Sequence, residues 1–282
     1  MDNATFRSFL QVLPPVEFAC VYGSSLHPSN HDKTIMTDYI LGVSDPKQWH
    51  SENLKLNKHH YASWMVHLGG ESLITGVADR IGVGVHFNPF VTWNGKLFKY
   101  GVVRMHDLLQ DVQYWEKFYL CGRLQKPVHI VVDNLDVSST NSVNLRAAVS
   151  AALLLLPSEF TEADLYAKVC SLSYTGDIRM LFAEDKSKDC DLSVACSLVS
   201  ALPSSIRSQI SMKEEIRETG RVIPDTKVST REAAANCLQR ILRQRVMVSS
   251  ARQAISGFLA VGGVNATRYL AKKVNKAWKS WS

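Results

Sequence analysis

Short apolar runs alternate with polar loops along the first half of the chain, and the spacing predicts strands. The run Phe18–Tyr22 predicts one strand, and a second is predicted at Asp38–Val43 after a polar connector over residues 26–33. Pro46 follows at once and ends the second strand. Further strands are predicted at 82–87, 99–103 and 127–132, the last one buried, with a turn at Asn94-Gly95 because this pair tolerates positive φ.

Helical patterns occupy the intervals between these strands and dominate the second half. Helices are predicted within 49–68, over 106–119 and over 143–156, and Thr161 is the N-cap of another. Residues 138–142 form a linker or a helix cap. The pattern therefore predicts an α+β fold, with a mixed-sheet domain over 1–137, a mostly helical domain over 138–250 and a terminal segment over 251–282.

Composition is that of a globular protein, with 46% hydrophobic and 21% charged residues among 282. The six cysteines form no C-x-x-C pair, so we expect reduced thiols in an intracellular compartment. From the first residues we expect neither a secretory signal nor a convincing organellar presequence, and no apolar stretch reaches the length of about 18 residues that spans a bilayer.

Positive charge is concentrated at the end of the chain. Glu232 is the last acidic residue, and nine lysines and arginines follow it. Because those nine exceed the net charge of +6, the rest of the chain carries a net charge of about −3. This distribution indicates a localised anionic partner and speaks against a nucleic-acid groove across the whole body.

The basic tail also has a helical apolar pattern. From Ala266 onward, Leu270, Val274 and Ala277 recur at helical spacing together with two tryptophans, and the lysines fall on the other side. Such a helix is suited to the interface of an anionic membrane. The alternative is packing on the protein body or on a partner helix. The membrane candidates are Lys272, Lys273, Lys276, Trp278, Lys279 and Trp281.

The first two predicted strands carry a candidate phosphate site. The first ends in Tyr22-Gly23-Ser24-Ser25, and the second opens with Asp38. Glycine lets the backbone approach a phosphate closely, hydroxyls and amides bond its oxygens, and a carboxylate can hold Mg²⁺. Nucleotidyltransferases seat a nucleoside triphosphate in this way. On this motif alone, an ordinary turn is the alternative.

A larger ordered set of residues accompanies this motif. It comprises Asp38–Pro46 with Trp49, His50, Asn53, Asn57, His60 and Tyr61, then 84–88, 99–103, 122–128 and 172–180. In this order the set resembles the mitochondrial phosphatidate cytidylyltransferase family over about residues 15–183 and again over 247–282.

The resemblance implies a nucleotidyltransferase domain followed by a winged-helix-like domain and a C-terminal amphipathic helix. It implies transfer from CTP to phosphatidate with release of pyrophosphate, giving CDP-diacylglycerol for cardiolipin synthesis. The expected cofactor is Mg²⁺, and the expected location is the matrix side of the mitochondrial inner membrane, as a peripheral protein. The expected partners are CTP, phosphatidate and an anionic membrane surface, and no nucleic acid.

The residue types suggest a role for each position. Tyr22, Gly23, Ser24 and Ser25 would cradle the nucleotide, with Ser24 also catalytic, and Asp38 would be catalytic and hold Mg²⁺. Three basic residues are candidate phosphate clamps, with exposed surface charge as the alternative for each: Lys99, Arg123 and Lys126.

One departure from the usual pattern concerns the second metal carboxylate. The position two after Asp38 is Ile40, so a second ligand must come from elsewhere. Asp177, in a polar turn, is the first choice as a catalytic and metal-binding residue, although it could instead form a local ion pair with Arg179. Asp45 and Asp133 are the alternatives. A stretch after residue 188 is also shortened relative to the family, which could weaken or abolish activity.

Two other functions remain open at this stage. One is a nucleotidyltransferase acting on RNA ends, and the other is a non-catalytic membrane-associated assembly factor that keeps the fold. A zinc site is not expected at His27 and His31, because Pro28 between them prevents a shared helical face. His59 and His60 are expected on a helix surface or at the rim of a pocket.

Overall fold

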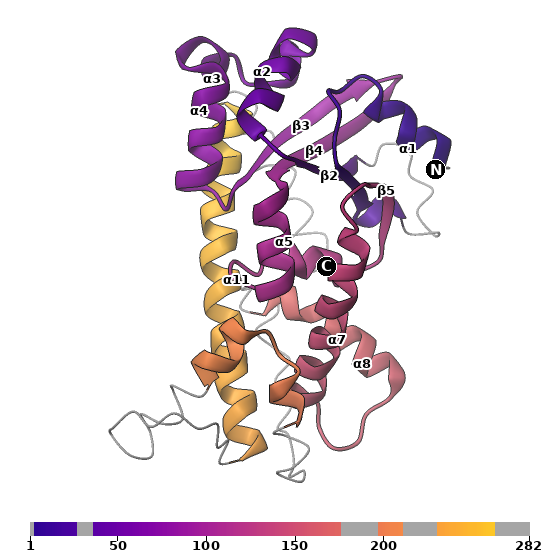
Figure 1. Ribbon diagram of the computed structural model, residues 1–282, viewed down its shortest axis with the longest axis vertical. Helices are drawn as coiled ribbons and strands as arrows, with labels where there is room; N and C mark the ends of the chain where they lie inside the picture. The colour runs from indigo at the N-terminus through magenta and orange to yellow at the C-terminus, as the bar shows by residue number, and fades with distance from the viewer. Residues whose placement is uncertain (1–2, 27–35, 176–196, 211–229, 263–282) are drawn as a thin grey trace, which may run out of the picture. The chain divides into compact units, whose positions relative to one another are not determined.

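The computed structural model describes residues 3–26, 36–175, 197–210 and 230–262. The chain folds into two compact units (Figure 1). The first unit holds Met1–Asp107, Val128–Leu135 and the segment from Ala251 onward, and the second holds Leu108–Pro127 and Asp136–Ser250. Residues 108–127 thus lie in the second unit, whereas the sequence prediction placed them in the first domain.

A five-stranded mixed sheet forms the centre of the first unit. Its strands are β1 (Phe18–Tyr22), β2 (Thr37–Val43), β3 (Val85–Trp93), β4 (Lys96–Arg104) and β5 (Val128–Asp133), in the order β3-β4-β2-β1-β5. Only the β2–β4 pair is parallel. The mixed sheet and the helices described below confirm the α+β class.

The predicted strands are found, with differences in their bounds and burial, and β4 is longer than the predicted 99–103. The β3–β4 hairpin turns at Asn94 and Gly95, whose φ values of 47° and 70° confirm the predicted turn. β3 begins at Val85 rather than at residue 82 and runs on to Trp93. β5 is only partly buried, because it is the edge strand of the sheet and has a neighbour on one side only. The prediction of a buried strand there was wrong.

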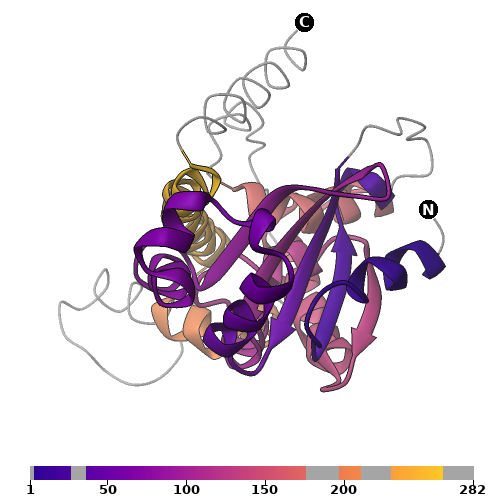
Figure 2. The same ribbon diagram turned by 90° about the horizontal axis from the view of Figure 1, so that it is seen from above.

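One face of the sheet carries the main apolar core of the first unit. Side chains alternate between faces along a strand, so Val21, Tyr39 and Tyr100 share this face. Helix α1 (Asn3–Leu10) covers it with Phe6 and Phe9, and in Figure 2 this helix lies alongside β5. Helix α2 (Pro46–Leu56) adds Trp49 to the same cluster.

Short helical segments continue from α2. They are η2 (Lys58–His60), α3 (Ser63–Leu68), α4 (Gly70–Gly76) and the π-helical turn η3 (Val77–Ile81). The prediction of helix within 49–68 is met by α2, η2 and α3, with breaks at Asn57 and around Tyr61. A further short helical turn, η1 (Ser24–Leu26), follows β1.

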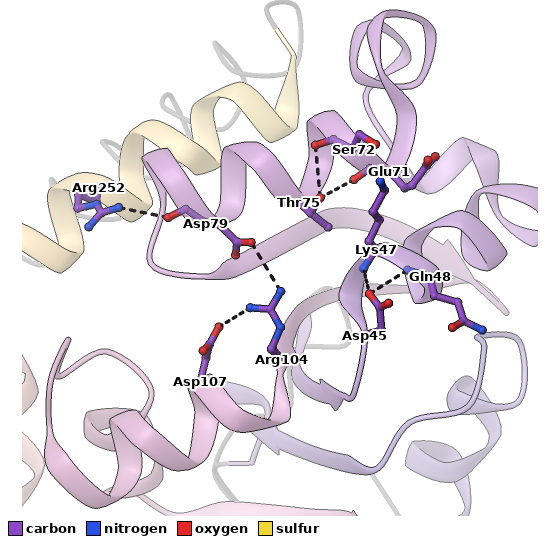
Figure 3. A network of polar contacts seen from close by, with 10 residues as sticks. All are labelled: Asp45, Lys47, Gln48, Glu71, Ser72, Thr75, Asp79, Arg104, Asp107 and Arg252. Carbon is purple, nitrogen blue, oxygen red and sulfur yellow. Dashed lines mark hydrogen bonds and ion pairs between the residues drawn. The ribbon is translucent and has the colours of Figure 1, made fainter.

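The C-terminal part of helix α11 (Arg231–Val261) packs on these segments. The Arg252 guanidinium donates to the carbonyls of Ile81 at 3.0 Å and Arg80 at 2.9 Å. The Gln253 amide donates to the Val85 carbonyl at 3.1 Å and accepts from the Val83 N–H at 3.4 Å. Figure 3 shows Arg252 reaching the carbonyl of Asp79. The C-terminal part of α11 therefore packs against the start of β3 and forms hydrogen bonds to its backbone.

The second unit is helical and has its own apolar core. It contains most of α5 (Met105–Tyr114), then α6 (Cys121–Leu124), α7 (Val137–Leu155), α8 (Glu162–Ser171), η4 (Leu172–Tyr174), helical residues 204–210 and the first part of α11. Alanines of α7 let Leu238 and Ile241 of α11 approach closely, and all are buried in one cluster.

Three helix boundaries test the sequence prediction. Thr161 caps α8 with a reciprocal hydrogen-bond pair to Asp164, which confirms the predicted N-cap. Helix α7 begins at Val137, capped by Asp136, so residues 138–142 are helical rather than a linker. Helix α5 ends at Tyr114, five residues before the predicted end. Among the described helices, none is long and apolar enough to cross a membrane.

Candidate active site

Gly23 and Asp38 lie side by side at one end of the sheet. Tyr22 pairs with Asp38 in the antiparallel β1–β2 register, so the turn after β1 starts directly beside the carboxylate. Gly23 has φ +91°, a left-handed conformation that a side chain disfavours, and a Cβ there would lie 3.4 Å from Asp38 Oδ2. The backbone of the turn is therefore open toward the aspartate, as the sequence prediction required.

The Asp38 carboxylate has spare capacity to bind a ligand. Its side chain is 25% exposed, and Oδ1 accepts no hydrogen bond within the described part of the chain. The Ser25 Oγ is also buried without a hydrogen-bond partner among those residues. An anionic oxygen and a hydroxyl that form no hydrogen bond to the described residues suit a hydrated cation and phosphate oxygens. Ser24 is the first residue of η1, and its side chain lies outside the described part of the structure.

Lys99 supplies the positive charge of this site. It pairs with Asp38 across the parallel β2–β4 strands, and its Nζ lies 3.4 Å from Asp38 Oδ1. The ammonium also lies 4.4 Å from the centre of the Phe87 ring. That ring covers Gly101, where a Cβ would come within 2.4 Å of a ring carbon. Gly101 thus leaves room for Phe87, and Phe87 and Asp38 together hold the ammonium.

Two candidates for the second metal carboxylate lie too far from Asp38. Asp45 caps α2 and accepts from the Lys47 N–H at 2.8 Å and the Gln48 N–H at 3.2 Å (Figure 3). Asp38 lies near the start of β2 and Asp45 lies beyond its end at Val43, and the strand from 38 to 43 alone spans about 16 Å at about 3.3 Å per residue. Asp133 pairs with Phe18, at the end of β1 away from Tyr22.

The remaining candidate lies outside the described residues. Asp177, together with Arg179 and the shortened stretch after residue 188, falls in 176–196. Ile40 lies on the same strand face as Asp38 and is buried, and its side chain offers no metal ligand. Among the described residues, no group of three or more histidine, cysteine or acidic side chains is placed to hold a metal. Asp177 stays a prediction.

Arg123 and Lys126 lie in the second unit, each over an aromatic ring. The Arg123 guanidinium lies 3.7 Å from the centre of the Tyr119 ring, and the Lys126 ammonium lies 3.6 Å from that of Tyr174. The segments that carry them pack tightly, since a Cβ at Gly122 would lie 2.6 Å from Ser173 Cβ. Both cations are therefore ordered on aromatic faces rather than extended into solvent.

The other polar residues of the motif set form a buried network on the opposite face of the sheet. The Asn53 amide donates to the hydroxyls of Tyr61 and Tyr100, both at 2.8 Å. His50 Nδ1 lies 2.9 Å from the Tyr61 hydroxyl, and His60 Nδ1 lies 2.9 Å from that of Tyr100. This network ties α2 and η2 to β4. The expectation that His60 lies on a surface or a pocket rim was wrong, whereas His59 is exposed.

Burial keeps the histidines of this network neutral, together with His86, whose ring centre lies 5.2 Å from that of His50. It lowers the pKa of His60 and of His86 to about 4, and it lowers the pKa of His50 well below its usual value, with His86 adding to the effect. Burial also raises the pKa of Tyr61 and Tyr100. The network therefore consists of neutral hydrogen-bonding groups at neutral pH, and it supports the fold rather than the reacting groups.

Sequence reasoning missed Phe87 and Tyr119 as partners of the cationic residues. The signal for Phe87 was weak, because an aromatic residue in a strand indicates core first. The close approach of Gly101 was a better signal, since a glycine inside a strand marks a place where something packs against the backbone. The membrane candidates at 272–281 lie outside the described residues.

Known proteins are similar in sequence to this chain over most of its length. Residues 6–190 and 187–276 match the family described as "Phosphatidate cytidylyltransferase, mitochondrial". Proteins of that name include one from Bos taurus, 32% identical over 326 residues, covering 99% of this chain and 96% of that one. The Saccharomyces cerevisiae protein is 34% identical over 94% of this chain and 68% of its own. The Homo sapiens protein is 42% identical over 191 residues, 65% of this chain and 42% of that one.

A solved structure is also similar, but too weakly to support an argument. It is a nucleotidyltransferase-like protein from Exiguobacterium sibiricum, with a TM-score of 0.28 and 11% identity over 91% of this chain and 78% of that one. The family match covers nearly the whole chain and includes both halves of the site motif. The chain therefore belongs to the mitochondrial phosphatidate cytidylyltransferase family.

Proposed function

We propose that this protein transfers the cytidylyl group of CTP to phosphatidate. A phosphate oxygen of phosphatidate forms a bond to the α-phosphorus of CTP, the bond from that phosphorus to the bridging oxygen breaks, and pyrophosphate leaves. The products are CDP-diacylglycerol and pyrophosphate. The observation that carries the proposal is the open glycine turn at Gly23 directly beside the carboxylate of Asp38, with Lys99 at the same end of the sheet.

The residues of the first unit suit the triphosphate. The Gly23 turn lets phosphate oxygens approach backbone N–H groups, and Ser25 Oγ is an available hydrogen-bond donor. Lys99 adds a fixed positive charge for the phosphate, where two anions must meet. Because the ammonium is held by Phe87 and Asp38 before the substrate arrives, little side-chain entropy is lost on binding.

The residues present also fit a magnesium ion. Asp38 offers Oδ1, which accepts no hydrogen bond from the described residues, and the neighbouring turn has no side chain that fills the space beside Oδ2. Bound Mg²⁺ would offset phosphate charge and help align the attacking and leaving oxygens. Asp177 is proposed as the second carboxylate. In the second unit, Arg123 and Lys126 are proposed to bind substrate phosphate oxygens.

Radiolabelled CTP offered with phosphatidate liposomes tests the proposal. Label in the α-phosphate should move to a lipid-soluble product with wild-type protein and not with Asp38→Ala. Label incorporated into added RNA would favour a nucleotidyltransferase acting on RNA ends instead. No incorporation into either substrate, with folded protein, would favour the non-catalytic assembly factor. Label in lipid at equal rates with wild type and Asp38→Ala would overturn the metal-site assignment alone.

The tail is proposed to hold the enzyme on an anionic bilayer. The lysines over 272–279 each contribute about 1 kcal/mol near such a surface, and the two tryptophans suit the headgroup region. A protein that acts on a lipid with two acyl chains needs that contact. The proposed location is the matrix side of the mitochondrial inner membrane, where the product would serve cardiolipin synthesis.

Liposome sedimentation tests the tail. Deletion after Asn265 should abolish co-sedimentation with anionic vesicles, and the wild type should lose it on neutral vesicles. A matched variant that replaces Lys272, Lys273, Lys276 and Lys279 by glutamine keeps the length and the apolar side. If that variant sediments like the wild type, the charge-based part of the proposal is wrong.

A further inference from the structure

A buried carboxylate in the second unit holds a loop by its backbone. Asp111, 3% exposed, accepts from the N–H groups of Lys117 and Phe118 on Oδ1, both at 2.8 Å. Its Oδ2 accepts from the N–H groups of Tyr119 at 3.0 Å, Leu120 at 2.7 Å and Cys121 at 3.3 Å. Five successive amides therefore converge on one side chain and stabilise its charge, and the Arg245 guanidinium adds a favourable electrostatic interaction.

The loop held in this way has an unfavourable backbone conformation. Trp115 and Phe118 have φ values of 59° and 50°, in the left-handed region that bulky side chains avoid. Trp115 is fixed at one end, since its Nε1 donates to Asn144 Oδ1 at 2.7 Å and its carbonyl accepts from Arg245. Such strain persists only where the surroundings determine the conformation, and it gathers at functional segments.

Arg123 takes its position from this loop. Its guanidinium stacks on the Tyr119 ring at 3.7 Å and donates to the Tyr119 carbonyl at 2.7 Å. The N–H of the same Tyr119 is bound by Asp111. Tyr119 thus connects the Asp111 carboxylate, which binds its N–H, to the Arg123 guanidinium, which contacts its carbonyl and its ring. Helix α6, which carries Arg123, begins at Cys121, the last of the five residues whose amides bind Asp111.

We propose that Asp111 is a positioning residue for the reaction: it fixes the loop over 115–121 so that Arg123 presents its guanidinium to a substrate phosphate. This inference rests on the proposed role of Arg123 as a phosphate clamp. The ligand chemistry is a phosphate group, which both CTP and phosphatidate carry. Asp111 itself is buried and acts only through Tyr119 and Arg123.

A double-mutant cycle in the full-length enzyme tests the coupling. Asp111→Asn keeps the shape, but its amide nitrogen faces N–H donors, so part of the loop is released. We expect kcat/KM to fall about tenfold or more through a higher KM for one substrate. In an Arg123→Ala background, Asp111→Asn should lower kcat/KM less than twofold, because the guanidinium through which Asp111 acts is already absent. KM measured separately for CTP and for phosphatidate shows which phosphate Arg123 binds.

The outcomes separate this inference from the proposed function. If Arg123→Ala alone leaves kcat/KM unchanged, the clamp role fails and the positioning role falls with it. If Arg123→Ala lowers kcat/KM but Asp111→Asn multiplies the loss equally in both backgrounds, only the positioning role is overturned. Ile241→Val, in the apolar core of the same unit, is the control for destabilisation alone and should leave both KM values unchanged.

A second variant keeps the test decisive if Asp111→Asn does not fold. Tyr119→Leu retains the N–H that Asp111 binds and the carbonyl that Arg123 uses, and it removes the ring under the guanidinium. The rise in KM should match the substrate affected in Arg123→Ala and should vanish in the Arg123→Ala background. An equal loss in both backgrounds would overturn the inference.

Discussion

Lys99 occupies the position beside Asp38 that a cation would take, with Nζ 3.4 Å from Oδ1 across the parallel β2–β4 pair. The proposed Mg²⁺ would therefore compete with Lys99 for the Asp38 carboxylate before the nucleotide binds. Phosphate oxygens of a bound nucleotide would give the ammonium a second anion and relieve that competition. Under the proposed function, the pair would thus link metal binding to nucleotide binding.

We expect Lys99→Met to tighten the binding of Mn²⁺, as a probe for Mg²⁺, in the absence of nucleotide. The expected gain is about two- to fivefold, because a partly exposed ion pair contributes about 0.2–1 kcal/mol. The affinity for CTP should fall in the same variant. Titration followed by electron paramagnetic resonance measures the first effect. Lys96→Met, which removes a charge elsewhere on β4, should change neither, and unchanged Mn²⁺ affinity in Lys99→Met would contradict the competition.

Substitution of Gly23 by alanine separates backbone strain from nucleotide binding. Gly23 and Gly95 both have positive φ, +91° and +70°, and only Gly23 lies beside Asp38. Each alanine should lower the free energy of unfolding by about 1 kcal/mol. We expect only Gly23→Ala to raise the KM for CTP, by at least about tenfold, a loss of about 1.4 kcal/mol of binding. Equal KM values in the two variants would mean that the turn does not contact phosphate.

Gly101→Ala should displace Phe87 and with it the ammonium of Lys99. The added Cβ would come within 2.4 Å of the ring, and overpacking of this kind costs about 1–3 kcal/mol of stability. The KM for CTP should rise as well. Adding Phe87→Leu should recover stability and leave the KM high, because the smaller side chain fits but offers no ring to the lysine. Recovery of the KM in the double variant would argue against a role for the ring.

Asp45→Ala tests the assignment of that residue as a helix cap. Loss of its bonds to the N–H groups of Lys47 and Gln48 should destabilise the fold by about 1 kcal/mol, observed as a lower midpoint of thermal unfolding. Activity below that midpoint should stay at the wild-type level, whereas Asp38→Ala should lose it. A comparable loss in both variants would return Asp45 to the list of metal ligands.

The buried histidines make stability fall in mild acid. The pKa of His60 and of His86 is lowered to about 4 from a usual value of about 6.5, so the unfolded chain binds more protons between these values. Stability is therefore full above about pH 6.5 and declines as the pH falls toward 4, by at most about 1.4 kcal/mol per pH unit for each histidine. Urea unfolding at several pH values measures the slope, and His86→Asn should reduce it.

Much of this fold and site followed from local pattern. Phe18–Tyr22 and Asp38–Val43 were identifiable as strands because short apolar runs ended in turn residues, and antiparallel pairing then placed Gly23 against Asp38. The Asn94-Gly95 turn and the Thr161 cap were equally local. Such features depend on neighbours in the chain, which the sequence shows directly.

The features that escaped prediction depend on contacts between distant residues. Helix α5 was predicted to run to residue 119, but the carboxylate of Asp111 binds the amides of 117–121 and ends the helix at Tyr114. The polar residues around His60 in the sequence indicated an exposed side chain. In the structure His60 is buried, and its Nδ1 lies 2.9 Å from the Tyr100 hydroxyl. Neither the contact of Asp111 with the loop amides nor that of His60 with Tyr100 could be inferred from the spacing of residues in the sequence.

The chain crosses from one unit to the other at Asp107–Leu108, Pro127–Val128, Leu135–Asp136 and Ser250–Ala251. During synthesis the edge strand β5 therefore follows a segment of the second unit, and Gln253, which bonds the backbone at both Val83 and Val85, emerges only after the rest of the second unit. A ribosome-bound chain cannot complete its first unit early. Premature termination anywhere before this glutamine leaves that unit incomplete, a substrate for chaperones and proteases rather than a smaller working enzyme.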